Sequence, residues 1–98
     1  MRRRAPLGLG EVLGEALAGV APETLLARVQ ALWSGVAGPA IAAEATPIGE
    51  REGTVTVGCA SAVWAQELDL LGPDLRERLN GALGAPAVRR LRFVVKAP

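Results

Sequence analysis

Residues 54–71, TVTVGCASAVWAQELDLL, decide the fold because they place a strand directly before a helix. Val55, Val57 and Cys59 alternate with threonine and glycine, which is the pattern of a strand that is buried on one face. From Ser61 onward the apolar residues change to helical spacing, and this serine is a good N-terminal cap. A strand followed so closely by a helix indicates a domain that mixes α and β structure.

The same spacing rules predict elements on both sides of this stretch. The Arg51-Glu52-Gly53 segment is a turn, with a glycine available for positive φ, that closes a hairpin. Gly72-Pro73 is predicted to end the helix, with the proline opening another. The expected elements are helices over residues 9–19 and 22–37, strands over 43–50 and 54–59, helices over 61–71 and 73–83, and a strand over 89–95.

The predicted order α-α-β-β-α-α-β describes a three-stranded sheet with helices packed on one face. Residues 1–8 are expected to be a flexible basic N-terminus, and residues 9–98 a single domain. The last strand presents Leu91, Phe93 and Val95 inward and basic side chains outward. The face without helices is therefore expected to carry these residues: Thr54, Thr56, Arg90 and Arg92.

Composition argues against catalysis. The 98 residues include no histidine and one cysteine, and there is no G-x-x-x-x-G-K-[ST] motif, which excludes Ser-His-Asp chemistry, histidine-ligated metals and a P-loop. We expect a protein that is not an enzyme and has no cofactor, no metal and no small-molecule substrate. No apolar run approaches the roughly 18 residues of a membrane span, and a single cysteine is typical of a reducing compartment, so the expected location is the cytoplasm, without membrane contact.

Charge is concentrated at the ends of the chain. Three arginines lie in residues 1–10 and four basic residues in 89–98, whereas all ten acids lie between them. This distribution indicates an anionic partner, and solubilising ends are the alternative. Arg90 and Arg92 would stand about 6–7 Å apart on one sheet face, close to the spacing of consecutive phosphates, although an ordinary charged face has the same pattern. The candidate nucleic-acid-binding residues are Arg2, Arg3, Arg4, Arg89, Arg90, Arg92 and Lys96, and their binding is expected to be weak and salt-sensitive.

Trp64 and Leu68 are the candidate partner-binding residues. Tryptophan is enriched at interface hot spots, which favours an anchor for a partner protein. Core packing is the first reading for Trp64, because Leu68 and Leu71 share its stripe, the partner anchor is the second, and a stacking platform for a base is the third.

Three segments resemble the DciA family, which was long filed as a domain of unknown function. They are LWSGVAGPAIAAEATPI (32–48), GTVTVGCASAVWAQELDLLGPDLRERLN (53–80) and VRRLRFVV (88–95). The resemblance implies a KH-like domain that binds the bacterial replicative helicase and assists its loading on single-stranded DNA at replication initiation. The predicted order after the first short helix, α-β-β-α-α-β, is that of the type II KH topology. It also implies no ATPase activity.

Two rival functions fit the same elements. One is a KH-like RNA-binding module, such as a ribosome-associated factor, and the other is a structural domain that self-associates. Nucleic-acid-binding KH domains carry G-x-x-G between paired helices, where the phosphate backbone is clamped, whereas residues 72–75 read Gly-Pro-Asp-Leu, lack the second glycine and add an acid.

Overall fold

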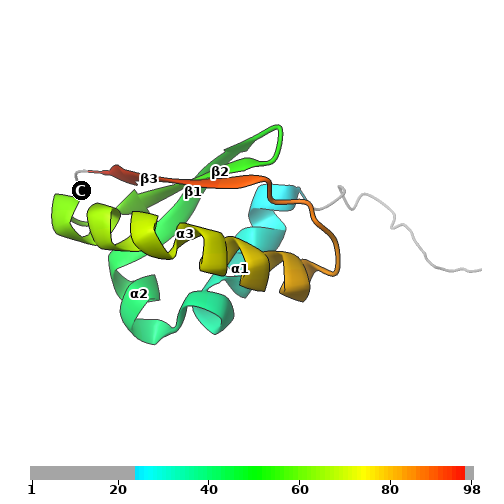
Figure 1. Cartoon of the computed structure of the whole chain (residues 1–98), viewed down its shortest axis with the longest axis horizontal. Coiled ribbons are helices and arrows are strands. Elements are labelled where there is room, and N and C mark those ends of the chain that lie inside the picture. Colours follow the sequence, from blue (N-terminus) through cyan, green and yellow to red (C-terminus); the bar gives the residue numbers. More distant parts are fainter. Residues whose placement is uncertain (1–23, 97–98) are drawn as a thin grey trace, which may run out of the picture.

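The computed structural model describes residues 24–96 of the chain. The predicted helix over 9–19 and the arginines Arg2, Arg3 and Arg4 lie outside this part. The elements are α1 (Leu25–Ala37), α2 (Pro39–Glu44), β1 (Ala45–Arg51), β2 (Thr54–Cys59), α3 (Ala62–Leu83) and β3 (Arg90–Val95), as Figure 1 shows. The predicted mixed α and β class is confirmed.

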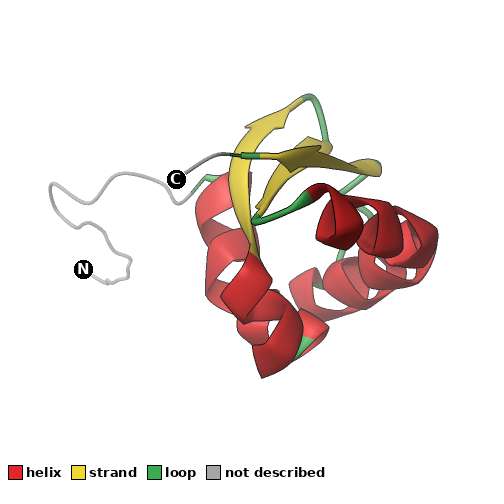
Figure 2. Cartoon of the chain, turned by 90° about the vertical axis from the view of Figure 1, so that its left-hand side faces the viewer, coloured by secondary structure: helices red, strands yellow, loops and turns green. Residues whose placement is uncertain are grey.

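The three strands form an open mixed sheet in the order β1-β2-β3. β1 runs antiparallel to β2, and β3 runs parallel to β2 after the long crossover through α3. The helices lie on one side of the sheet and leave the other side without a covering layer (Figure 2). This arrangement agrees with the one-sided packing that the sequence predicts.

The hairpin between β1 and β2 closes through two residues with positive φ, Glu52 at 51° and Gly53 at 87°. Positive φ at both central positions is typical of the tight turns that match strand twist. β1 is an edge strand whose register shifts between Pro47 and Gly49, in agreement with the edge or bulge that the proline predicts.

α1 is fixed to the sheet by a tryptophan. Trp33 is buried, and its indole N–H donates a 2.9 Å hydrogen bond to the carbonyl of Ala45, the first residue of β1. The helix begins after Thr24, whose hydroxyl accepts from the Ala27 N–H at 3.0 Å. It ends at Gly38, where φ is 92°.

The predicted break at Gly72-Pro73 is wrong, because α3 is one helix of 22 residues that contains Pro73. Its buried residues form a single stripe along the whole length: Leu68, Gly72, Leu75, Leu79 and Leu83. Gly72 is buried, and Pro73 faces solvent. A proline inside a helix costs about 3 kcal/mol, and burial of the leucines beyond it outweighs that cost. The paired helices of the expected KH-like order are therefore one helix here, and the KH-like assignment is not confirmed.

One core cluster lies between the sheet and the helices. Within residues 24–96 its buried members are Val29, Trp33, Ala45, Val55, Val57, Cys59, Leu68, Leu75, Leu79, Leu83, Val88 and Leu91. The alternating valines of β2 are completely buried, so the threonines between them point to the uncovered side. Among the described helices, none combines the length and the apolar character needed to cross a bilayer.

Candidate nucleic-acid interface

The strand register gathers arginines on the uncovered side of the sheet. Thr54 of β2 lies between Arg51 of β1 and Arg90 of β3. Thr56 lies between Gly49 and Arg92 in the same way. Two threonines therefore form the floor of a trough whose two sides carry guanidinium groups.

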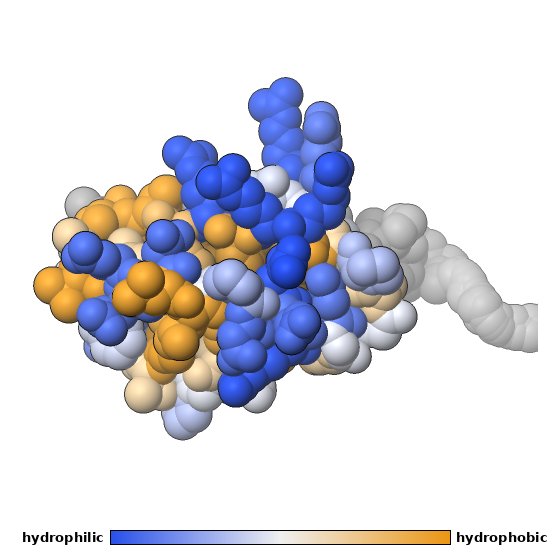
Figure 3. Space-filling view, viewed as in Figure 1, coloured by the Kyte–Doolittle hydropathy of each residue, from blue (hydrophilic) through white to orange (hydrophobic). Residues whose placement is uncertain are grey.

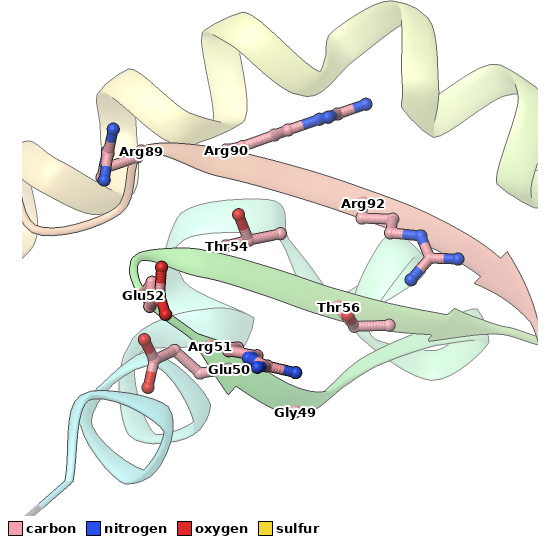
Figure 4. Close-up of a pocket in the computed structure, with 9 residues that line it drawn as sticks. All are labelled: Gly49, Glu50, Arg51, Glu52, Thr54, Thr56, Arg89, Arg90 and Arg92. Carbon is pink, nitrogen blue, oxygen red and sulfur yellow. The ribbon is translucent and has the colours of Figure 1, made fainter.

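We call this hollow of ≈ 690 Å³ the arginine trough (Figure 4). Its lining residues are Gly49, Glu50, Arg51, Glu52, Thr54, Thr56, Arg89, Arg90 and Arg92. All four arginines are exposed, and they outnumber the two glutamates. The glutamates lie at the turn end of the trough, where Glu50 accepts a 2.8 Å hydrogen bond from the Gly53 N–H. The end formed by Arg92 and Thr56 carries no acid among the residues that line the trough.

The guanidinium groups of the trough form no ion pair with any acid in residues 24–96. The ion pair found there joins Arg78 to Asp74 at 3.1 Å on α3. Arg28, by contrast, donates to the Leu83 carbonyl at 3.3 Å, at the negative end of α3. The guanidinium groups of the trough are thus free of acidic partners within residues 24–96, whereas that of Arg28 is already engaged by a carbonyl.

Arg89 lies at the corner of the trough and packs on the hairpin turn. Its backbone N–H donates to the Gly53 carbonyl at 2.8 Å. A Cβ atom on Gly53 would come within 2.7 Å of Arg89 Cδ, so the missing side chain of Gly53 makes room for the arginine stem. The hairpin turn therefore positions Arg89 as well as reversing the chain.

Of the predicted basic residues, Arg89, Arg90 and Arg92 come together in the trough. Lys96 does not line it, because its N–H pairs with the Cys59 carbonyl at the opposite end of β2. Arg51 is an addition that sequence reasoning missed, since it was assigned to the turn. Gly53 could have indicated the position of Arg51 in the strand. A two-residue turn over Glu52 and Gly53 leaves Arg51 as the last residue of β1, paired with Thr54.

The two candidate partner-binding residues have different environments. Leu68 has no exposed surface, so it belongs to the core and presents nothing to a partner. Trp64 is half-buried and packs against the core cluster. Its backbone N–H donates a 3.2 Å hydrogen bond to Oγ of Ser61, the predicted N-terminal cap. Trp64 therefore packs against the core and keeps part of its surface exposed.

The described residues contain no group of three or more histidine, cysteine or acidic side chains that could hold a metal ion. Cys59 is buried, and burial raises the pKa of its thiol. A protonated thiol in the core is a poor nucleophile and a poor metal ligand.

These features define a small α+β domain with an arginine-lined sheet face. The family model of DciA, the Dna[CI] antecedent, matches residues 8–93, and the chain belongs to the DciA family. The resemblance seen in the sequence is thereby confirmed.

Three relatives are similar to this chain in sequence. A UPF0232 protein of Streptomyces avermitilis is 37% identical over 93 residues, which cover 91% of this chain and 51% of the relative. A UPF0232 protein of Streptomyces coelicolor is 33% identical over 95 residues, which cover 93% of this chain and 50% of the relative. A UPF0232 protein of Rhodococcus jostii is 32% identical over 75 residues, which cover 76% of this chain and 40% of the relative. The chain spans about half the length of the first two relatives.

Proposed function

We propose that this chain is a non-catalytic adaptor that binds the replicative DNA helicase and assists its loading on single-stranded DNA. Membership of the DciA family supports the helicase partner. The arginine trough supports the nucleic acid, and it is the observation that carries the proposal, because four exposed arginines line one uncovered sheet face.

The trough fits a phosphate backbone better than it fits a base. Guanidinium groups bind phosphate oxygens in a bidentate manner, and the hydroxyls of Thr54 and Thr56 can donate to further oxygens. No aromatic residue lines the trough, so sequence-tolerant base stacking has no platform there. Ile48, 40% exposed, covers Gly58 and does not line the trough. Contacts dominated by phosphate make the affinity modest and strongly dependent on salt.

Binding energy alone would then drive the proposed activity. The chain would hold the helicase through one surface and a DNA strand through the trough, which raises the local concentration of the strand near the ring. No chemical step in the chain itself is required.

The first test is whether the purified chain co-migrates with the replicative helicase of its own host in size-exclusion chromatography. The second is fluorescence anisotropy with a labelled oligothymidine over a series of salt concentrations. Replacing both Arg90 and Arg92 with alanine should weaken binding and lower the salt slope by roughly two, at about one per phosphate contact.

Arg78→Ala is the matched control, because it removes an exposed arginine from α3 and leaves the trough intact. An equal loss of affinity in the control, or an unchanged slope in the double variant, would remove the trough from the proposal. Tighter, salt-resistant binding to a structured RNA than to the oligothymidine would favour the RNA-binding alternative.

A further inference from the structure

Three large apolar side chains are exposed in the first half of α3. The exposed fractions are 69% for Val63, 76% for Leu70 and 46% for Leu71. Val63 and Leu70 are seven residues apart, so they lie on the same side of the helix, away from the buried stripe that contains Leu68. Hydrophobic surface extends over the end of the molecule where α3 begins (Figure 3). We call the surface formed by Val63, Glu67, Leu70, Leu71 and Asp74 the α3 outer face.

The α3 outer face is also acidic. Glu67 lies between Val63 and Leu70 on the same side of the helix, and Asp74 follows one turn later. Asp74 is engaged by Arg78, whereas Glu67 has no ion-pair partner among residues 24–96. A partner that covers the apolar side chains would therefore meet an uncompensated negative charge.

The charge separates this surface from the arginine trough. The helices lie on one side of the sheet and the trough on the other, so the two surfaces do not compete for space. Phosphate groups are repelled by the acids of α3, which excludes a DNA strand as the occupant. A second copy docked α3 to α3 would bring Glu67 and Asp74 against acids of the same kind, which disfavours self-association.

We infer that the α3 outer face docks an amphipathic helix of the helicase partner, with apolar side chains flanked by lysine or arginine. This inference rests on the proposed function. A helix is the fitting shape because side chains such as Val63 and Leu70 form ridges along α3. Such ridges pack into the grooves between the side chains of a second helix. From Val63 to Asp74 the surface is about 17 Å long, which corresponds to three helical turns of the partner.

Trp64 flanks this surface. Trp64 and Leu71 are seven residues apart, so they lie on the same side of the helix two turns apart, on the flank nearer the core, and Trp64 is only partly buried there. This position gives the half-buried tryptophan a role in packing and in docking at once.

The test is the affinity of the full chain for the purified host helicase, measured by biolayer interferometry. A Val63→Ser, Leu70→Ser double variant should bind about tenfold more weakly or worse, since it removes apolar surface that the docked helix would bury. Ile48→Thr is the control, because it reduces an exposed apolar side chain on the other face of the sheet. Glu67→Lys should also weaken binding, whereas Asp69→Lys, an acid of the same helix that faces the β3 side, should not.

The outcomes separate the inference from the proposed function. If the wild-type chain binds the helicase and the double variant binds equally well, the inference is overturned and the proposed function stands. If the wild-type chain does not bind the helicase, both fail. If sedimentation shows a wild-type dimer that the double variant abolishes, the occupant is a second copy and the inference is overturned. Unchanged thermal unfolding and unchanged oligothymidine affinity in the double variant confirm that the loss is local.

Discussion

The Asn80 side chain holds the backbone of Val88 through two hydrogen bonds. Its Nδ2 donates to the Val88 carbonyl at 2.9 Å, and its Oδ1 accepts from the Val88 N–H at 2.8 Å. Val88 is itself buried, so these bonds satisfy backbone groups that have no access to water. One asparagine near the end of α3 therefore fixes the segment that leads into β3 and its arginines.

Asn80→Ala should lower the free energy of unfolding by about 1–3 kcal/mol, because it leaves the buried Val88 groups unsatisfied. Urea denaturation measures the change, and hydrogen exchange should show the Val88 amide losing protection. Asn80→Asp, which keeps the acceptor and loses the donor, should also destabilise. A stability equal to that of the wild type in both variants would contradict this role.

Two glycines should respond in opposite directions to alanine. Gly53→Ala should destabilise by more than about 1 kcal/mol, because its φ is 87° and the added Cβ meets the Arg89 stem. Gly81→Ala in α3 should stabilise by roughly 0.5–1 kcal/mol, since nothing lies within 4 Å of the added atom. Thermal unfolding of the two variants checks the direction of each change in melting temperature. Equal shifts in the two variants would show that the turn at Gly53 does not require glycine.

Pro73→Ala should raise the stability of the domain by about 1–3 kcal/mol. The substitution restores a helical N–H and removes the clash of the ring with the preceding turn. Pro73 is exposed, so no core contact is lost. Chemical denaturation provides the measurement, and a loss of stability would indicate that the segment around Gly72 is a true helix boundary.

The Cys59 thiol should resist modification in the folded protein. Burial raises its pKa, so the folded state holds the proton at a pH at which the unfolded chain releases it. The unfolded state then binds fewer protons, and stability falls as the pH rises above the ordinary thiol pKa. Cys59→Ala should unfold with a weaker dependence on alkaline pH, and rapid reaction of the native thiol with a disulfide reagent at neutral pH would contradict the prediction.

The sequence predicts the sheet well and the longest helix poorly, for physical reasons. The alternation of Val55, Val57 and Cys59 is local and periodic, so it identifies β2 and its buried face without reference to other elements. Gly72-Pro73 is also a local signal, but the energy that overrides it comes from tertiary burial of the leucines on both sides.

The site shows the same division. Arg90 and Arg92 were predictable because one strand places them on one face, whereas Arg51 required the register of the hairpin. Burial of Leu68 follows from a stripe that continues through Pro73, which a helix ending at residue 71 conceals. The half-exposure of Trp64 depends on the elements packed around the start of α3, and no local pattern encodes it.

The parallel docking of β3 has a consequence for the order in which the domain gains its properties. The hairpin is a local structure, whereas β3 pairs with a strand more than thirty residues earlier, so it is expected to assemble late. Until then, the hairpin presents Glu50, Arg51 and Glu52, which together carry a negative charge. The arginine trough of the proposed function therefore exists only once the sheet is complete, because docking of β3 brings Arg90 and Arg92 alongside Thr54 and Thr56.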